Sequence, residues 1–438
     1  VEYIWHNARE LPNKLAITDK YSHTTYEELW NYILGFQTYL KKTGLQKGDF
    51  VIMQASQTLA YAVAYFGTHL AGGIFAPIEK MSSVDVLRNL NRQLHAAFLI
   101  CKPELYFNEY QGHYIESDAI LQLAAENYSE NTAFTFPEPD SSSEILFTTG
   151  TTGASKCVEL SHKSIVAVAQ NLIYGCEMKK DTIILVPGPL NHANPIRKLF
   201  TAMVNGSGIV LLDGMISIKA FFDALDNEHV NAMCLPPAAI RTIFQLSKNK
   251  LGEYADQIDF IESATSPLPE PDKERLCKLL PKTRLYNNYG SSESGSVCMY
   301  DYNRYRGLTG CIGKAMPNSE IFISDENGNA IKATKENPGF IACKGPVNMK
   351  GYLNDPVTTA QVLRNGIVYT NDLGYIDDQG FIYIVGRKGD VINVGGRKVA
   401  PAEVEEKALA YPGISDCICV PVQDKITGMA VKLLVVLG

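Results

Sequence analysis

Short apolar runs rich in β-branched residues alternate with longer amphipathic stretches along most of the chain. Residues 49–55 (DFVIMQA) and 73–78 (GIFAPI) have the composition of buried strands, and residues 58–72 between them predict a helix that ends at Gly72. The pattern recurs with strands at 181–190 and 208–213 around a helix at 195–206, and with a strand at 230–237 before a helix at 237–248. This alternation predicts an α/β fold with mainly parallel sheets.

The pattern changes near residue 370, where turn signals at Asp377–Gly380 and Gly395–Gly396 separate short apolar segments and predict hairpins. Pro401 at a first helical position, followed by acidic residues, then predicts a helix. We therefore predict two domains: a large N-terminal domain of layered mixed and parallel sheets with helices over 1–386, and a small α+β domain over 387–438. The chain has no initiator methionine and stops within an apolar run (VKLLVVLG), so we expect the small domain to be incomplete.

Composition excludes some classes of protein but does not indicate a function. The 438 residues are 46% hydrophobic and 20% charged, with a net charge of −7, which argues against a general nucleic-acid binder. The ten cysteines form no CxxC pair, and Cys417 and Cys419 are expected to share one strand face, so we predict buried thiols in a reducing cytoplasm. We find no signal peptide, and we interpret the uncharged stretch 57–78 as a buried helix and strand rather than a membrane span.

One loop, LFTTGTTGASK at 146–156, has little apolar surface to bury and is rich in hydroxyls and glycine. We place it between a strand at 144–147 and a helix at 161–173 capped by Ser161, where α/β folds bind ligands. Backbone N–H groups, hydroxyls and one ammonium suit a phosphate chain. The candidate ligands are Thr148, Thr149, Gly150, Thr151, Thr152, Gly153 and Lys156. The glycine spacing does not match a Walker loop, and a solvated turn is the alternative.

The loop and the residues after it, LFTTGTTGASKCVELSH, resemble the signature of the adenylate-forming superfamily, which includes acyl-CoA synthetases, luciferases and peptide-synthetase adenylation domains. Cys157 departs from that signature, which usually has glycine there. Further stretches resemble the family's motifs in the family's order: TTYEEL (24–29), LAGGIFAPI (70–78), PLNHANP (189–195), SATSPLP (263–269), NNYGSSES (287–294) and residues 369–405. The resemblance covers nearly the whole chain.

The resemblance implies an enzyme that joins a carboxylic acid to AMP, releases pyrophosphate, and passes the acyl group to a thiol. It implies ATP and Mg²⁺ as cofactors and coenzyme A as co-substrate. Lys156 and its loop would hold the β- and γ-phosphates, Glu293 the Mg²⁺, and Asp372 both ribose hydroxyls. It also implies roles for the remaining residues. Tyr289 would stack on adenine, and Asn288, Ser263, Ala264 and Thr265 would line the base pocket, with Gly290 a further nucleotide-binding residue. Ser292 would contact phosphate, Arg387 would reach ribose or phosphate, and His192 would lie beside the acyl site.

The resemblance also implies a rotation of the small domain between the two steps. Its pivot falls at Gly389, and Gly395, Gly396 and Arg397 would approach the pantetheine tunnel. The family's C-terminal lysine would lie beyond residue 438, so we expect the chain as printed to adenylate slowly.

Several alternatives stay open at this point. The acceptor is CoA or, alternatively, a carrier-protein phosphopantetheine, and a non-catalytic nucleotide- or acyl-adenylate-binding protein is the second rival. Arg197 and Lys198 stand where amino-acid-activating members usually have an acid, which favours another kind of acid. We expect Arg197 on a helix surface rather than against a distal carboxylate of the substrate. Acyl-pocket walls are predicted from His192–Arg197, Leu235–Ile240 and Ser294–Met299, while the identity of the acid and the oligomeric state are not indicated.

Overall fold

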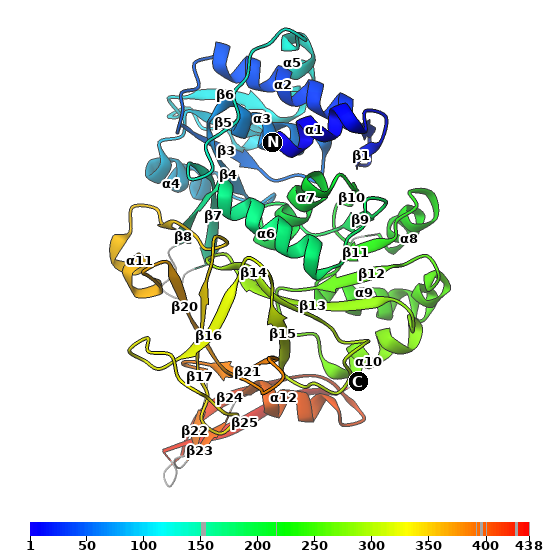
Figure 1. Ribbon diagram of the computed structural model, residues 1–438, viewed down its shortest axis with the longest axis vertical. Coiled ribbons are helices and arrows are strands. Elements are labelled where there is room, and N and C mark those ends of the chain that lie inside the picture. Colours follow the sequence, from blue (N-terminus) through cyan, green and yellow to red (C-terminus); the bar gives the residue numbers. More distant parts are fainter. Residues whose placement is uncertain are drawn as a thin grey trace. The chain divides into compact units, whose positions relative to one another are not determined.

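The computed structural model describes residues 1–149, 155–215, 217–390, 392–394, 397–399, 401–424 and 428–437. The chain forms two compact units, which are described separately, and Figure 1 labels their elements. Unit 1 comprises Val1–Leu235, Gly290–Ser296 and Pro346–Thr359, and unit 2 comprises Pro236–Tyr289, Val297–Gly345 and Ala360–Gly438. The mixed α/β class predicted from the pattern is confirmed, whereas a boundary at residues 386/387 stays a prediction.

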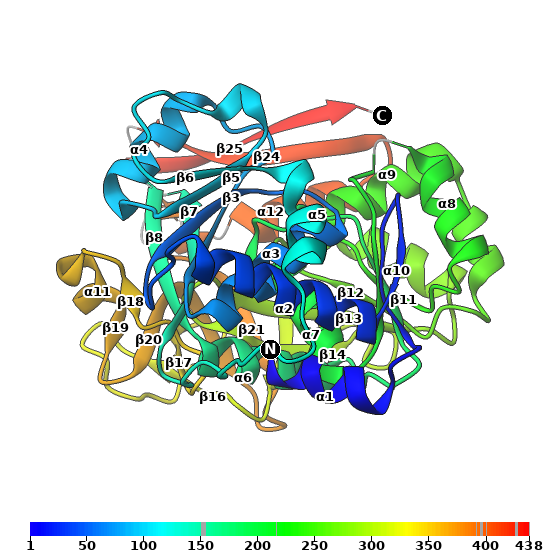
Figure 2. The ribbon, with the colours of Figure 1, turned by 90° about the horizontal axis from the view of Figure 1, so that it is seen from above.

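Unit 1 contains a seven-stranded sheet in the order β18–β8–β7–β4–β3–β5–β6. Its middle is parallel, as predicted, and β8 and β18 are antiparallel to their neighbours at one edge. Figure 2 shows β3, β5 and β6 lying side by side. The bounds are β3 Phe50–Gln54, β4 Ile74–Ile78, β5 Phe98–Cys101, β6 His113–Glu116, β7 Ser142–Thr149, β8 Ser155–Ser161 and β18 Gly351–Tyr352.

A second run of strands in unit 1 has the order β11–β9–β10–β1–β2. All of its pairings are parallel except that between β1 and the edge strand β2. The bounds are β1 Leu15–Thr18, β2 His23–Thr25, β9 Ile183–Val186, β10 Gly208–Leu211 and β11 Ala232–Cys234. The helices of this unit are α1 Glu2–Glu10, α2 Tyr26–Lys42, α3 Leu59–Ala71, α4 Val84–Leu94, α5 Ile120–Asn127, α6 His162–Gly175, α7 Ala193–Asn205 and α8 Ile218–Asn227, with short 3-10 turns at Pro103–Leu105 and Ser117–Ala119.

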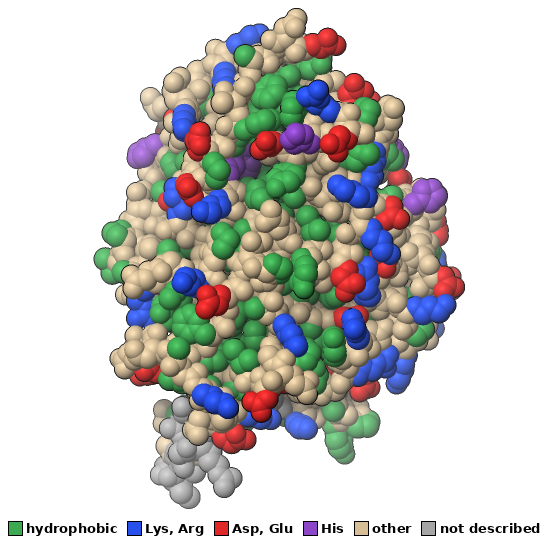
Figure 3. All heavy atoms as spheres, in the orientation of Figure 1, with side chains coloured by type: hydrophobic (Ala, Val, Ile, Leu, Met, Phe, Trp, Pro, Cys, Tyr) green, Lys and Arg blue, Asp and Glu red, His purple; other side chains and the backbone are tan. Residues whose placement is uncertain are grey.

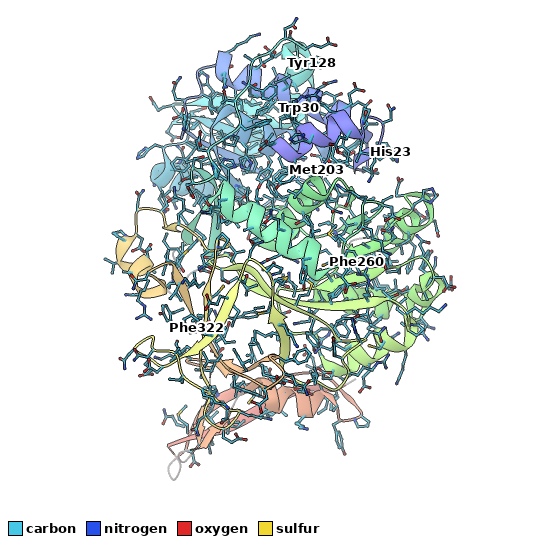
Figure 4. All side chains as sticks on the ribbon, in the orientation of Figure 1. His23, Trp30, Tyr128, Met203, Phe260 and Phe322 are labelled. Carbon is cyan, nitrogen blue, oxygen red and sulfur yellow. The ribbon has the colours of Figure 1, made fainter. Side chains whose placement is uncertain are left out.

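Local signals in the sequence explain where these helices begin and end. Helix α3 starts after Thr58, whose side chain accepts from the Tyr61 N–H, and ends at Gly72 with φ 90°, as predicted. Helix α2 has a capping box between Thr25 and Glu28. Trp30 of α2, labelled in Figure 4, packs edge-on against Phe134 with ring centroids 5.2 Å apart, so this helix is fixed by its apolar face.

Unit 2 is largely antiparallel. Its strands follow the order β16–β17–β20–β21–β15–β14–β13–β12, in which only β12 and β13 are shown to pair in parallel. Phe260 of β12, labelled in Figure 4, is fully buried. The bounds are β12 Phe260–Ser263, β13 Arg284–Ser291, β14 Gly295–Asp301, β15 Cys311–Ala315, β16 Glu320–Ser324, β17 Gly339–Lys344, β19 Leu363–Arg364, β20 Ile367–Ile376 and β21 Ile382–Arg387, with helices α9 Pro237–Ser247, α10 Glu270–Leu279 and α11 Pro356–Val362 and a 3-10 turn at Lys250–Tyr254; β13, β14 and α11 each run across a unit boundary.

The hairpins and the helix predicted after residue 370 are present. Strands β20 and β21 are joined by a turn in which Asp377 accepts the N–H groups of Gln379 and Phe381, and Gly380 has φ 81°. Beyond it lie β22 Ile392–Val394, β23 Arg397–Val399, α12 Pro401–Leu409, β24 Ile414–Asp424 and β25 Gly428–Leu437. Cys419 N–H donates to Glu405 of α12 (2.8 Å), so this helix packs on β24 in an α+β arrangement.

Most of the cysteines are buried, as predicted from the composition, and the surface carries charged side chains of both signs. All ten cysteines are free thiols, and nine of them are buried. Figure 3 shows basic and acidic side chains interspersed on the face in view. Within the described residues, no helix combines the length and apolar character needed to cross a bilayer.

We expect stability to fall as the pH drops below about 6.5, because two buried imidazoles are held neutral in the folded state. His69 and His162 contact each other edge-on, with ring centroids 4.9 Å apart. Burial lowers the pKa of His162 to about 3, and burial also lowers the pKa of His69. In the unfolded chain both protonate near pH 6.5, so their contribution is complete above that pH and is lost as the pH falls towards 3.

The size of this effect can be measured by urea unfolding between pH 7 and pH 5. Each such histidine should lower the free energy of unfolding by about 1.4 kcal/mol per pH unit below 6.5. His162→Gln should make the dependence shallower, while His6→Gln, at an exposed position, should leave it unchanged. An unaltered slope in His162→Gln would show that this imidazole does not carry the effect.

Candidate functional site

The threonine–glycine loop is flanked by strands β7 and β8, which pair antiparallel. We predicted that it joins a strand directly to a helix, and this is wrong in one respect: β8 lies between the loop and α6. Thr148 pairs in register with Lys156, and Thr149 with Ser155. The predicted ligands Gly150, Thr151, Thr152 and Gly153 lie outside the described residues. The pairing of β7 with β8 therefore fixes the two ends of the loop opposite each other.

Cys157 stands at the position where the family's loop signature usually has glycine. Its side chain is buried in the core beneath the sheet, with Sγ 3.5 Å from Gln93 Oε1 of α4. Burial raises the pKa of the thiol, so it behaves as a small apolar side chain. Because side chains alternate along a strand, Lys156 points to the opposite face.

Lys156 and Glu293 meet the same aromatic side chain in unit 1. The Lys156 ammonium lies 5.1 Å from the centroid of the Tyr352 ring, and the Tyr352 hydroxyl donates to Glu293 Oε1 (2.8 Å). Burial and the Glu293 carboxylate raise the pKa of Tyr352, which keeps the hydroxyl a donor. Met349 N–H donates to the Glu293 carbonyl (2.8 Å), which anchors the backbone here. A cation and a carboxylate are thus brought to one place.

This group fits a magnesium ion that is shared with a substrate. Mg²⁺ is usually held by one or two carboxylates together with substrate phosphates rather than by an all-protein cage. Among the described residues, no cluster of three or more histidine, cysteine or acidic side chains forms such a cage. Glu293 would supply the single carboxylate for such an ion, and the Lys156 ammonium at the same tyrosine would supply positive charge for the phosphates.

Tyr289, Asp372 and Arg387 meet in unit 2. The Tyr289 hydroxyl donates to Asp372 Oδ2 (2.6 Å), and Arg387 Nε lies 3.4 Å from Asp372 Oδ1. Asp372 and Arg387 are register partners on β20 and β21. Burial, and secondly the Asp372 carboxylate, raises the pKa of Tyr289. The Arg387 side chain is 63% exposed, so its ion pair contributes little to stability and its guanidinium remains open to solvent.

The carboxyl ends of the parallel strands β12 and β13 carry the residues predicted for the base pocket. Ser263 and Ala264 are buried, whereas Thr265 is exposed with φ 79°. Asn288 is buried and donates to Glu262 Oε1 (2.7 Å). Parallel strands end at the same sheet edge, so the structure brings Ser263 and Asn288 to one edge of unit 2.

Gly290 and Ser292 lie in the short segment of unit 1 that contains Glu293. A Cβ atom at Gly290 would meet the Gly295 carbonyl oxygen at 2.0 Å. Only glycine fits this close approach. Ser292, also predicted, is half-buried.

His192 is the N-cap residue of α7 and is exposed. Arg197, five residues on, was expected on the surface of this helix, and that expectation is wrong. Its side chain is buried and forms an ion pair with Glu144 of β7, and Lys198 beside it is also buried. The reason is that α7 is buried on all sides from Pro195 to Met203, and Glu144 supplies this arginine with a carboxylate partner. The predicted acyl-pocket walls remain a prediction.

Gly389 has φ 97° with open space around its Cα, a conformation that favours glycine. Gly395, Gly396 and the Arg397 side chain lie outside the described residues. A cavity of about 410 Å³ lined by Arg88, Asn91, Arg92, Phe107 and Glu109 contains none of the predicted residues.

Sequence reasoning missed three residues of these groups. Tyr352 joins Lys156 to Glu293, Glu262 holds Asn288, and Glu144 holds Arg197. Each acts through a partner distant in sequence, so no local pattern marks it. An acid within the otherwise apolar EILF strand was the one available signal, and it points to Glu144.

The fold and the ordered motifs define an adenylate-forming protein of the superfamily that the sequence resembles. The family model of the AMP-binding enzymes matches residues 4–353. Because this match covers most of the chain, the protein belongs to the AMP-binding enzyme family.

Known relatives at modest identity are acid–CoA ligases. The chain is 27% identical to a long-chain-fatty-acid–CoA ligase of Bacillus subtilis, covering 98% of this chain and 84% of the relative, and 26% identical to a 4-coumarate–CoA ligase of Vanilla planifolia, covering 89% and 75%. Its fold matches ATP-bound MatB of Rhodopseudomonas palustris (TM-score 0.88, 24% identity, 100% of this chain and 88% of that one). It also matches o-succinylbenzoate CoA synthetase (MenE) of Bacillus subtilis in complex with ATP and magnesium (TM-score 0.86, 23% identity, 99% and 89%).

Proposed function

We propose that the protein is an ATP-dependent acid–thiol ligase. A carboxylate attacks the α-phosphorus of ATP, forming an acyl-adenylate and breaking the bond to pyrophosphate, which leaves. A thiol, proposed to be that of coenzyme A, then attacks the acyl carbon, forming a thioester, releasing AMP and losing its proton. The observation that carries the proposal is that Lys156 and Glu293, the residues expected at the phosphates and at the magnesium ion, both contact Tyr352 within unit 1. Within unit 2, Tyr289 and Arg387 both contact Asp372, the residue expected at the ribose.

Electrostatic repulsion is the main obstacle to the first step. Two unit charges 4 Å apart repel by about 4 kcal/mol at an effective dielectric near 20, and a carboxylate must approach a polyanion. Lys156 and the loop 148–153 would oppose this repulsion at the β- and γ-phosphates. Mg²⁺ held by Glu293 would neutralise further phosphate charge. No strong base is required, because the acid is already ionised at neutral pH.

Binding of the nucleoside is assigned to unit 2. Asp372 would accept hydrogen bonds from both ribose hydroxyls, and Arg387 would reach ribose or phosphate. Tyr289 would lie against adenine, with Asn288 and residues 263–265 along the base. Orientation supplies much of the rate in such in-line displacements, and the contacts of Asp372 with Tyr289 and Arg387 would hold this carboxylate in position.

Acid-dependent pyrophosphate release by the full-length protein tests the proposal. Short, long, aromatic and dicarboxylic acids are each supplied with ATP and Mg²⁺, and at least one should release pyrophosphate without CoA. Acyl transfer to free CoA, compared with transfer to a holo carrier protein, then identifies the acceptor; the names of the relatives favour CoA. Release of neither pyrophosphate nor AMP with any acid would reject the proposal and favour a nucleotide-binding protein without catalysis.

A further inference from the structure

Helix α3 is buried along almost its whole length, yet one of its faces is polar. Tyr61, Tyr65 and His69 recur every four residues, and Gln57 precedes the helix at the same spacing. Residues four apart lie on one face of a helix. Burying polar groups is costly unless they are hydrogen-bonded, so the partners of Gln57, Tyr61 and Tyr65 show what this face holds in place.

The first two residues of this face hold the segment that leads to His192. Gln57 Nε2 donates to the Gly188 carbonyl (2.6 Å), and its Oε1 accepts from the Leu190 N–H (3.2 Å). The Tyr61 hydroxyl donates to the Leu190 carbonyl (2.9 Å). The backbone up to two residues before His192 is therefore fixed to helix α3.

The next residue of this face reaches a buried ion pair. The Tyr65 hydroxyl donates to Glu144 Oε2 (2.6 Å). Arg197 donates to the same carboxylate through both terminal nitrogens, Nη1 to Oε2 at 3.3 Å and Nη2 to Oε1. Glu144 is fully buried and Arg197 is 4% exposed.

The two charged partners belong to the two elements that matter for the proposed reaction. Glu144 lies on β7, four residues before Thr148 and the phosphate loop, and Arg197 lies on α7, five residues after His192. All of these residues are in unit 1. The network thus spans the strand that enters the ATP loop and the helix that begins beside the predicted acyl site.

We propose that Tyr65, Glu144 and Arg197 are positioning residues that set the phosphate-loop strand against the acyl-site helix, and so align the acid with ATP. The inference rests on the proposed function. A buried ion pair often stabilises a protein no more than well-packed apolar side chains of similar volume would. What a bidentate pair adds is a single geometry, and a misplacement of about 1 Å at a reacting centre can cost on the order of 100-fold in rate.

The test separates geometry from stability. The double variant Glu144→Met/Arg197→Met fills the same space with apolar side chains and should keep a melting temperature near that of the full-length wild type. Its kcat for acid-dependent pyrophosphate release should nevertheless fall about 10- to 100-fold, with a smaller change in KM for ATP. Tyr65→Phe should show the same pattern, a lower kcat at a nearly unchanged melting temperature, with a smaller fall in kcat. Tyr110→Phe removes another buried hydroxyl, which donates to the Ala96 carbonyl (3.0 Å), and should leave kcat unchanged.

A kcat of the double variant equal to that of the wild type would show that the pair serves only to fold the protein and would overturn the inference. A fall in kcat that follows the melting temperature across all the variants, Tyr110→Phe included, would do the same. If the wild type activates no acid, the proposed function fails instead. Hydrogen exchange of residues 144–149 and 188–194 then decides the positioning role: faster exchange in both segments of the folded double variant supports it, and unchanged exchange overturns it.

Discussion

Lys156→Ala is expected to lower kcat/KM for acid-dependent pyrophosphate release by about 10²- to 10³-fold, which corresponds to roughly 3–4 kcal/mol of lost transition-state stabilisation. The ammonium lies beside Tyr352 at the base of the phosphate loop, on the same ring that binds Glu293. In the proposed reaction, its removal would leave the negative charge that develops on the departing pyrophosphate without a fixed cation. The loss should appear in both kcat and KM for ATP, because the proposal places the ground-state phosphates beside the same ammonium.

The matched controls are a neighbouring lysine and a variant that retains the charge. Lys163→Ala removes an exposed ammonium, 3.6 Å from Asp140, and should leave the reaction within about two-fold of wild type. Lys156→Arg should retain part of the activity, since the charge remains but the geometry of the donors differs. Equal activity of Lys156→Ala and Lys163→Ala would remove this lysine from the proposed mechanism, while a similar unfolding midpoint for both would exclude a folding defect as the explanation.

The sequence predicts the helices and strands of this chain well where one signal dominates. Helix α3 has a threonine cap, a glycine stop and an apolar interior, and the structure follows them closely. Strand β8 was missed because SKCVELS mixes polar and apolar positions and is defined by pairing with β7 and β18. Pairing of this kind depends on tertiary contacts that local propensity does not contain.

The candidate site could be predicted only as far as motif order allowed. Motifs nominated Lys156, Glu293 and Asp372 individually. Their partners lie in distant segments: Lys156 has a cation–π contact with Tyr352, and Glu293 and Asp372 accept hydrogen bonds from Tyr352 and Tyr289. Tyr352 stands in the short GYLND stretch, which has no motif character in this sequence. Side-chain partners across a fold are set by packing, and a single sequence does not display packing.

Arg197 was predicted to be exposed, and the prediction failed because its partner could not be seen in the sequence. An arginine in an amphipathic helix is normally exposed, and we therefore predicted a surface position for Arg197. The structure buries it because Glu144, more than fifty residues earlier, supplies a matching carboxylate. The error arose from treating each charge alone, since a buried charge is tolerated only as a member of a pair.

Asp372→Asn is expected to weaken ATP binding by about 10²-fold or more while leaving the fold intact. A charge-assisted hydrogen bond contributes roughly 1.5–3 kcal/mol, and the proposed role gives this carboxylate two of them, one to each ribose hydroxyl. The amide keeps the shape, but it loses the charge and one acceptor. Tyr289 and Arg387, which contact the carboxylate at 2.6 and 3.4 Å, also lose part of their partner. The KM for ATP should therefore rise more than kcat falls.

Deoxynucleotides make this prediction specific to the ribose. Wild type should use 2′-deoxy-ATP and 3′-deoxy-ATP much less well than ATP, because each lacks one of the two hydroxyls. Asp372→Asn should largely erase this preference, since the group that reads the hydroxyls is gone, and Asp378→Asn, on a fully exposed turn acid of the same hairpin, should keep it. If Asp372→Asn discriminates against the deoxynucleotides as strongly as wild type does, the ribose is read elsewhere. The carboxylate would then serve to orient Tyr289 and Arg387 rather than to bind ATP.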